Sequence, residues 1–511
     1  QTRIAKAAKA QQWRRVQCLQ RLLVRSTTAK AVAVRRVTEN QGRKTPGVDG
    51  VTWSTPTEKR QAMDTLNTRG YRPKPLRRIH IPKANGGKRP LGIPTMRDRA
   101  MQALHWLALD PVAETLGDVN SYGFRTGRST ADALAQCRNA LGRPTSPQWI
   151  LEGDIKGCFD NISHDWLMKH VPMDRDVLKK WLKAGFVEDR QLFPTEAGTP
   201  QGGIISPVLA NMVLDGMEIM LDGLPRRAKV NFIRYADDFI VTADSKELLE
   251  AKVKPMIAAF LAERGLTLSE TKTKITHVSE GFDFLGWTLR KRKQNGILLV
   301  TPSKKNASAF YEKVRCRIRA LRGATQDDVI FALTPVIRGW GNYHRVAHAS
   351  RTFAEMDHHV FHALWCWAKR RHPNKGKRWV KRRYFRRTGS RDWLFKTDVA
   401  ELFRLSRIPM MVRYVKVRGD ANPYDPANES YFDKRLQWRM SESLAGRVKL
   451  SKLWKKQEGR CAECGERMTS ESGWHVHHVI WRTFGGTNDQ ANLRLLHPVC
   501  HVQLHARGST G

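Results

Sequence analysis

The sequence predicts a multidomain α+β protein, and three features of the chain support that prediction. Its 511 residues correspond to roughly three to four domains of ordinary size. Short β-branched and aromatic runs alternate with helical segments over the first 290 residues, which indicates a mixed α and β fold. Beyond about residue 300 the pattern is helical and strongly basic, and cysteines and histidines gather near the C-terminus.

The charge of the chain indicates its class of partner. Lys and Arg number 90 against 48 Asp and Glu, a formal net charge of +42. A charge this large predicts a polyanion, above all nucleic acid, bound with an affinity that falls with salt. A membrane surface is the competing polyanion, but no apolar run approaches the roughly 20 residues that span a bilayer, and no signal-peptide pattern opens the chain. We therefore expect no membrane partner.

The elements are expected in the following order. Residues 1–40 are Ala-, Arg- and Lys-rich without Gly or Pro, which predicts one or two basic helices. Gly and Pro break residues 41–95 into loops and short strands. Residues 97–117 are expected to be helical, and residues 149–155 form a buried strand that ends in an acid. Residues 415–435 lack periodicity and predict a linker or a small irregular unit.

Two adjacent carboxylates, Asp237 and Asp238, interrupt an apolar run at residues 231–241. The run is typical of two strands joined by a tight turn. Like charges side by side repel, and a divalent cation would remove that repulsion. Asp154 ends an earlier predicted strand, so carboxylates from separate strands could hold two metal ions for phosphoryl transfer. For the pair alone, a solvated Asp-Asp turn is the alternative.

These residues resemble the palm motifs of reverse transcriptases, in particular those encoded within group II introns. The resemblance rests on blocks in the family's order: Ile81–Lys83 with Arg89–Pro94, Ser121–Ser129, Asp154–Ile162, Gly198–Pro207, Tyr235–Asp238, Leu268–Thr273 and Phe284–Trp287. It implies a right-hand polymerase with fingers, an antiparallel palm sheet and an α-helical thumb. Ordered sets of motifs are far more specific than single ones, so the simple turn becomes the weaker interpretation of Asp237 and Asp238.

The resemblance also implies roles for individual residues. Asp154, Asp237 and Asp238 would hold catalytic Mg²⁺, with Asp237 the stronger ligand candidate of the pair. The dNTP site would comprise Lys83, Arg89, Phe159, Gln201, Gly202 and Lys272. Among these, Phe159 would exclude ribonucleotides by overlap with the sugar 2′ position. Each assignment has an alternative. Phe159 could be an ordinary core residue, and Lys83 and Arg89 could belong to a solvated basic loop. Gln201 and Gly202 could form a plain turn, and Lys272 could be a surface lysine.

Residues 336–345 resemble the signature of the maturase (X) domain, which serves as the thumb and grips intron RNA. The basic run 369–387 follows, with eleven Lys or Arg in nineteen positions. Cations neutralise phosphates and aromatic rings offer stacking faces. The RNA-binding candidates are Arg338, Trp340, Tyr343, Arg345, Lys381, Arg382 and Arg383. Packing of the aromatic rings in a core is the alternative, as is a solvated charged face.

Cys461-x-x-Cys464 and His497-x-x-Cys500 have the spacing of a tetrahedral Zn²⁺ site, with unliganded thiols as the alternative. The segment between and after these pairs resembles the HNH endonuclease motif, a ββα-metal unit. The resemblance implies that His478 is the general base and that His477 and His501 bind a divalent ion. It further implies that Asn492 holds the hairpin loop and that His505 is a further ligand or phosphate contact. A structural zinc knuckle is the alternative.

Taken together, the resemblance implies an RNA-directed DNA polymerase, splicing maturase and DNA endonuclease that acts in a ribonucleoprotein with lariat intron RNA. Its partners would be that RNA, target DNA and dNTPs, in the cytoplasm of a bacterial-type cell in association with RNA and nucleoid DNA; dimerisation is left open. The expected units are 1–80 (basic extension and start of the fingers), 81–295 (fingers and palm), 296–395 (thumb/maturase), 396–450 (DNA-binding region or linker) and 451–511 (HNH). The alternatives are a non-catalytic RNA chaperone and a defence-type reverse transcriptase.

Overall fold

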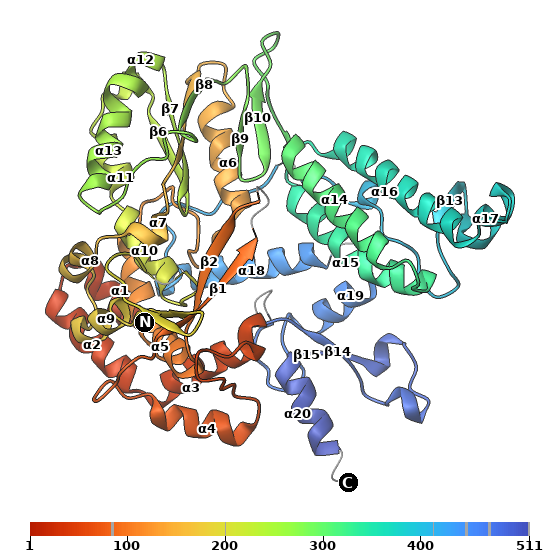
Figure 1. The fold of residues 1–511 in the computed structure, drawn as a ribbon, viewed down its shortest axis with the longest axis horizontal. Coiled ribbons are helices and arrows are strands. Elements are labelled where there is room, and N and C mark those ends of the chain that lie inside the picture. Colours follow the sequence, from red (N-terminus) through yellow and green to blue (C-terminus); the bar gives the residue numbers. More distant parts are fainter. Residues whose placement is uncertain (83–85, 200, 412, 445–447, 469–471, 509–511) are drawn as a thin grey trace.

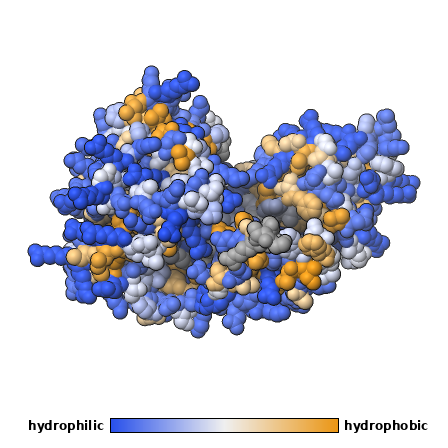
Figure 2. Space-filling model, turned by 90° about the horizontal axis from the view of Figure 1, so that it is seen from below, coloured by the Kyte–Doolittle hydropathy of each residue, from blue (hydrophilic) through white to orange (hydrophobic). Residues whose placement is uncertain are grey.

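The computed structural model describes residues 1–82, 86–199, 201–411, 413–444, 448–468 and 472–508. Its ribbon shows the N-terminal helices and two sheets on one side and a helical lobe on the other, with the C-terminal unit below that lobe (Figure 1). In the space-filling view a notch separates two lobes whose visible face is mostly hydrophilic (Figure 2). The predicted multidomain α+β class is confirmed.

The first unit is built around one long buried helix. Its elements are α1 (Thr2–Lys9), α2 (Trp13–Arg25), α3 (Thr27–Glu39), α4 (Pro56–Thr65), α5 (Met96–Leu116) and the sheet β2-β1-β4-β5, formed by β1 (Leu76–Pro82), β2 (Lys88–Ile93), β4 (Phe186–Glu188) and β5 (Gln191–Phe193). Helices α1, α2 and α3 all pack on α5, which is buried on most of its circumference and has charged residues, such as Asp98 and Glu114, among its buried side chains.

The central antiparallel sheet has the order β6-β7-β3-β8. Its strands are β3 (Trp149–Asp154), β6 (Asn231–Tyr235), β7 (Asp238–Ala243) and β8 (Lys274–His277). Side chains alternate across a strand, and here both faces are covered. Ile150 and Ile240 belong to one apolar core, whereas Leu151 and Val241 belong to another. The sheet therefore separates two cores, and its strand ends are held rigidly. This half is completed by the helices α6 (Thr130–Leu141), α7 (Cys158–Asn161), α8 (His164–His170), α9 (Arg175–Leu182), α10 (Ser206–Leu214), α11 (Met217–Asp222), α12 (Lys246–Leu248) and α13 (Lys254–Ala262).

The second lobe is helical. It is preceded by a three-stranded sheet of β9 (Phe282–Phe284), β10 (Trp287–Lys291) and β11 (Leu298–Pro302). The helices α14 (Lys304–Ala320), α15 (Gln326–His344), α16 (Ser350–Arg371) and α17 (Lys377–Tyr384) follow. A hairpin of β12 (Phe385–Thr388) and β13 (Arg391–Phe395) comes after them. Buried residues from Ala307 to Ile408 form its own core. The described residues include no helix with the length and apolar character that a bilayer crossing requires.

The last part of the chain returns to the first lobe before it forms a small ββα unit. It comprises α18 (Glu429–Ser443), α19 (Val448–Lys456), β14 (His475–His478), β15 (Leu493–Leu496) and α20 (Pro498–Gly508). Strands β14 and β15 are antiparallel, with His478 opposite Leu493. This unit has a separate small core that includes Trp454 and Leu495.

Three predicted elements differ from the structure. Residues 1–40 hold three helices rather than one or two, because Gln11 takes a left-handed φ of 55° and Ser26 caps α3 by accepting a hydrogen bond from the Ala29 N–H. The irregular segment 415–435 runs into α18 from residue 429. The basic run 369–387 spans the end of α16, α17 and most of β12.

Candidate active sites

The two adjacent aspartates lie at the turn of a hairpin. Tyr235 pairs with Asp238, so the turn residues are Ala236 and Asp237, and Ala236 adopts φ 59°. Gly123 presses on the back of this turn, because a Cβ there would lie 2.3 Å from the Ala236 nitrogen. Only glycine allows that approach, so the Ser121–Ser129 block supports the turn from behind.

A buried arginine holds the same turn from below. Arg234 is 0% exposed and forms an ion pair with Asp215 of the segment after α10. Its guanidinium also donates to Asn211 Oδ1 at 3.1 Å and to the Ala236 carbonyl at 3.4 Å. Burial raises the pKa of Asp215 to about 6, against the opposing charge of Arg234. Arg234 is absent from the residues predicted from the sequence, although a charged residue inside a buried strand was an available signal.

The three predicted carboxylates lie together at the end of the central sheet. Asp154 is the cross-strand neighbour of Asp238, and Lys272 Nζ donates to Asp154 Oδ2 at 2.8 Å. Burial, then the charges of Asp237 and Asp154, raise the pKa of Asp238 to about 6. A cation placed among these carboxylates would relieve that electrostatic cost. The three carboxylates are not all within 4.8 Å of one another. Among the described residues, the clusters that meet this distance are two Cys and His groups near the C-terminus.

A cavity of about 260 Å³ is lined by two of the predicted dNTP contacts, Phe159 and Gln201, together with residues of β1, β2 and β4. The buried Gln201 Oε1 has no hydrogen-bond partner among the described residues. Gly202 has φ +111°, and a Cβ there would lie 2.7 Å from the Gly92 carbonyl oxygen. The glycine is thus needed for close approach between this loop and β2.

The remaining predicted dNTP contacts differ in placement. Lys83 lies outside the described residues. Arg89 is exposed on β2, opposite Ile81. Burial raises the pKa of Asp237, and Arg89 and Lys272 are the cations that oppose the rise. Arg89 therefore lies within electrostatic reach of the carboxylates.

In the thumb, the aromatic rings that were predicted to stack on RNA instead pack against other aromatic rings of the protein. Trp340 stacks on Phe310 at 4.3 Å between centroids and Tyr343 stacks on Trp287 at 4.6 Å. Arg338 lies over the Phe403 ring at 4.6 Å. These contacts give Trp340 and Tyr343 a packing function, which is the alternative raised for them from the sequence.

The other predicted RNA contacts divide between buried and exposed. Arg345 is 7% exposed. Lys381 pairs with Asp392 at 2.6 Å and lies 4.6 Å from the Trp393 ring centroid. Arg382 and Arg383 are exposed on α17. These last two present their charge directly to solvent.

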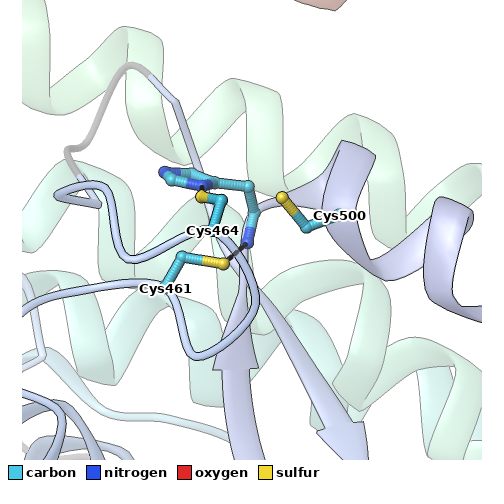
Figure 3. A group of neighbouring side chains, drawn as sticks. Cys461, Cys464 and Cys500 are labelled. Carbon is cyan, nitrogen blue, oxygen red and sulfur yellow. Dashed lines mark hydrogen bonds between the residues drawn. The ribbon is translucent and has the colours of Figure 1, made fainter.

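Four side chains near the C-terminus form a ligand set for a metal ion. The ligand atoms of Cys461, Cys464, His497 and Cys500 all lie within 4.8 Å of one another, and the three cysteines point inward (Figure 3). His497 Nε2 donates to the Arg467 carbonyl at 3.2 Å, which leaves the lone pair of Nδ1, 3.3 Å from Cys464 Sγ, free to bind a metal. Burial and the neighbouring sulfurs raise the pKa of Cys500 to about 12, so joint ionisation of the thiols requires a cation.

A second set comprises the three histidines predicted to bind a divalent ion. The ligand nitrogens of His477, His501 and His505 lie within 4.8 Å of one another. Burial, then the charge of His505, lower the pKa of His477, which keeps its imidazole neutral and able to act as a ligand. The buried His477 Nδ1 has no hydrogen-bond partner among the described residues.

His478 lies on β14 beside these histidines, and its Nε2 donates to Asn488 Oδ1 at 2.9 Å. Asn492 bridges the loop: it accepts from the Ile480 N–H at 2.7 Å and donates to the Ile480 and Thr487 carbonyls at 3.0 and 2.8 Å. Asn492 therefore closes the loop between β14 and β15, and its part in orienting the base stays a prediction. Asn488 is absent from the residues predicted from the sequence, because nothing in its spacing distinguishes it from other loop asparagines.

Family models match the chain in four places. They are the N-terminal domain of reverse transcriptase at residues 1–66, reverse transcriptase (RNA-dependent DNA polymerase) at 81–289, the group II intron maturase-specific domain at 307–385 and HNH endonuclease at 461–507. The order agrees with the two lobes and the C-terminal ββα unit.

Similar proteins agree with these models. Protein YkfC of Escherichia coli is 34% identical over 336 residues, which cover 56% of this chain and 86% of that protein. The group II intron-encoded protein LtrA of Lactococcus lactis is 30% identical over 52% of this chain, and the chain spans 55% of LtrA. A telomerase structure from Candida albicans aligns with a TM-score of 0.35 at 11% identity over 61% of this chain and 64% of that one, which is too weak to carry an argument. The chain belongs to the family of group II intron-encoded proteins, with reverse transcriptase, maturase-specific and HNH endonuclease domains.

Proposed function

We propose that the chain is a multifunctional intron protein that combines RNA-directed DNA polymerase, RNA-splicing maturase and DNA endonuclease activities. The observation that carries the proposal is the pairing of Asp154 with Asp238 across adjacent strands, with Asp237 at the turn between β6 and β7. Carboxylates at strand ends, supported by rigid packing from behind, are what metal-assisted phosphoryl transfer requires.

In the polymerase, Asp154, Asp237 and Asp238 would hold Mg²⁺, which would neutralise the charge that develops on the transferred phosphoryl group. Phe159 and Gln201 line one cavity and would bind the sugar and base of the incoming dNTP. Arg89, together with Lys83, would attract its triphosphate. Lys272 now pairs with Asp154, so it would exchange that carboxylate for a phosphate when substrate binds.

In the nuclease, His477, His501 and His505 would hold a divalent ion, and His478 would accept the proton of the attacking water. Because Asn488 accepts from Nε2, the lone pair of His478 that takes this proton is on Nδ1. The Cys461, Cys464, His497 and Cys500 set has the donor atoms and closeness of a structural Zn²⁺ site. Zinc would tie the start of α20 to the loop before β14.

The partners follow from these activities. The chain would bind its intron RNA, help it to splice, and insert it into one strand of target DNA as a ribonucleoprotein. The HNH unit would then nick the other strand, and the polymerase would extend the new 3′ end with dNTPs on the RNA template. The net charge of +42 supports a polyanionic partner of this kind.

Two other functions are less well supported. A non-catalytic RNA chaperone would need neither the three carboxylates at the end of the central sheet nor the histidine cluster. A defence-type reverse transcriptase is the second alternative, and the chain is similar to the retron Mx65 reverse transcriptase of Myxococcus xanthus, 29% identical over 38% of this chain. Such an enzyme accounts for the polymerase, whereas the maturase-specific and HNH matches favour the intron protein.

The test separates the two active sites on the full chain. Asp237→Ala should abolish DNA synthesis on an RNA template and leave DNA nicking intact, because its carboxylate serves only the polymerase. Asp244→Ala is the matched control, since Asp244 follows β7 and pairs with Lys229 at the surface. His478→Ala should remove nicking and leave zinc content and DNA synthesis unchanged. Synthesis near wild type in Asp237→Ala, or nicking retained in His478→Ala, would contradict the assignment.

A further inference from the structure

A cavity of about 540 Å³ lies between α14 and α16, which pack side by side in the thumb (Figure 1). Five arginines line it: Arg315, Arg319, Arg322, Arg370 and Arg371. Among the residues that the structure describes, no Asp or Glu lines this cavity. Its size falls in the range of small-ligand sites, roughly 300–1,000 Å³, and its charge is entirely positive.

The arrangement of the arginines follows from helix geometry. Residues three and four apart share a face of a helix, so Arg315 and Arg319 of α14, continued by Arg322, form one row. Arg370 and Arg371 in the last turn of α16 face that row across the cavity. Two helices therefore present cations toward the same space.

Three of these cations are unpaired. Arg315 pairs with Glu312 at 3.2 Å, and Arg371 donates to the carbonyls of Arg322 and Ala324 at 2.7 and 2.9 Å. Of the arginines described here, the Arg319, Arg322 and Arg370 side chains form no ion pair or hydrogen bond with the protein. Like charges held this close repel, so an anion in the cavity would stabilise the arrangement.

The lining suits a nucleotide rather than a bare anion. Tyr311 and His362 add rings to the cavity wall, and rings beside cations are typical of single-stranded nucleic-acid sites. Arg370 and Arg371 also belong to the basic run 369–387, so a strand leaving the cavity would continue along a positively charged path. A free nucleotide would have no use for that path.

We propose that this cavity binds a nucleotide of single-stranded RNA, with its phosphates held by Arg319, Arg322 and Arg370. The identity of the strand as RNA rests on the proposed function, whereas binding of nucleotide phosphates rests on the cavity alone. Planar guanidinium groups bind phosphate oxygens in pairs, which accounts for arginine at all five cationic positions.

The free thiol of Cys366 provides the measurement, since it is exposed and lines the cavity. In the whole 511-residue chain loaded with zinc, a 20-nucleotide RNA of mixed sequence should slow alkylation of Cys366 about tenfold, as followed by mass spectrometry. The exposed Cys18 and Cys316, which do not line the cavity, should react at an unchanged rate. Alkylation needs neither polymerase nor nuclease activity, so the result is independent of whether those activities are present.

Arg370→Gln should remove the protection and Arg370→Lys should restore part of it. The matched control is Lys369→Gln, which removes the same charge from the same turn of α16 at an exposed position outside the cavity and should keep the protection. Thermal unfolding by circular dichroism verifies that each variant is folded. Protection by ATP at equal phosphate concentration would assign the site to a free nucleotide and overturn the RNA assignment. Absence of protection by either ligand, or equal loss in Lys369→Gln, would overturn the site itself.

Discussion

Single residues in this protein combine structural and chemical duties, and Arg234 is the clearest case. It stands between apolar neighbours in β6, yet its side chain connects the turn at Ala236 and Asp237 to Asp215 and Asn211. A buried ion pair contributes little to net stability, but removal of one partner leaves an uncompensated charge. Arg234 thus makes the position of Asp237 depend on the interior of the palm.

Arg234→Met should destabilise the protein by about 3–5 kcal/mol at pH 7.5, because Asp215 would remain buried without its cation. Burial already raises the pKa of Asp215 to about 6. A carboxyl with a pKa raised on folding favours the folded state below its ordinary pKa, and that contribution is lost as pH rises through about 6. The loss should therefore be smaller at pH 5. Urea unfolding at both pH values measures it.

Lys229→Ala is the comparison for that experiment. Lys229 and Asp244 form an exposed pair at the other end of the same hairpin, and such pairs contribute at most about 1 kcal/mol. Similar losses in the two variants would show that burial of the Arg234 pair has no energetic consequence.

At the scale of elements, α18 is attached to the palm through a buried acidic residue and through Phe432, which shares an apolar core with residues of α6. Asp132 of α6 is fully buried and accepts hydrogen bonds from Arg435 and Arg439 of α18 and, at 2.8 Å, from the Val417 N–H. The segment predicted as a DNA-binding region or linker is therefore tied to α6. Its role in DNA binding stays a prediction.

Asp132→Ala should release α18 from α6, because two arginines would lose their shared carboxylate. We expect faster amide hydrogen exchange across residues 414–443, with a loss of about 3–5 kcal/mol in local stability. Asp420→Ala is the control, since Asp420 is exposed and pairs weakly with Arg418. Unchanged exchange in α18 would show that apolar contacts alone hold it.

At the scale of the whole molecule, the predicted limits between units differ in how well they separate parts of the structure. The predicted limit at residue 295 falls between β10 and β11, which pair in one sheet, so the palm and thumb share structure there. The C-terminal unit instead has a small core of its own. A core this small needs a further constraint to stay folded, and a metal ion bound by four side chains would supply it.

Removal of zinc should therefore affect the nuclease activity and spare the polymerase activity. Cys464→Ser, or a zinc-selective chelator in excess Mg²⁺, should unfold the segment from Cys461 to α20 and abolish nicking. RNA-templated DNA synthesis should change less than twofold, because the palm carboxylates belong to a different core. Zinc content and hydrogen exchange of β14 and β15 report the unfolding. Nicking that survives complete loss of zinc would exclude a structural zinc site.

The residues of the candidate sites were largely predictable from the sequence. Strand ends at Asp154 and Asp238, the paired cysteines and the clustered histidines each left a local pattern. Other features left none: the breaks between α1, α2 and α3 contain no Gly or Pro, and Asn488 resembles any loop asparagine. Local patterns report local structure, whereas partners distant in sequence meet only through folding.

The sequence by itself determined the family, the order of the units, the polyanionic partner class and the identity of the metal-ligand candidates, because these depend on residue type and spacing. The tertiary structure decided which residues meet. It placed Asp154 opposite Asp238, turned Trp340 and Tyr343 into packing, and joined the arginines of α14 and α16 around one cavity. These outcomes depend on strand register and helix packing, which arise from contacts between segments far apart in the chain.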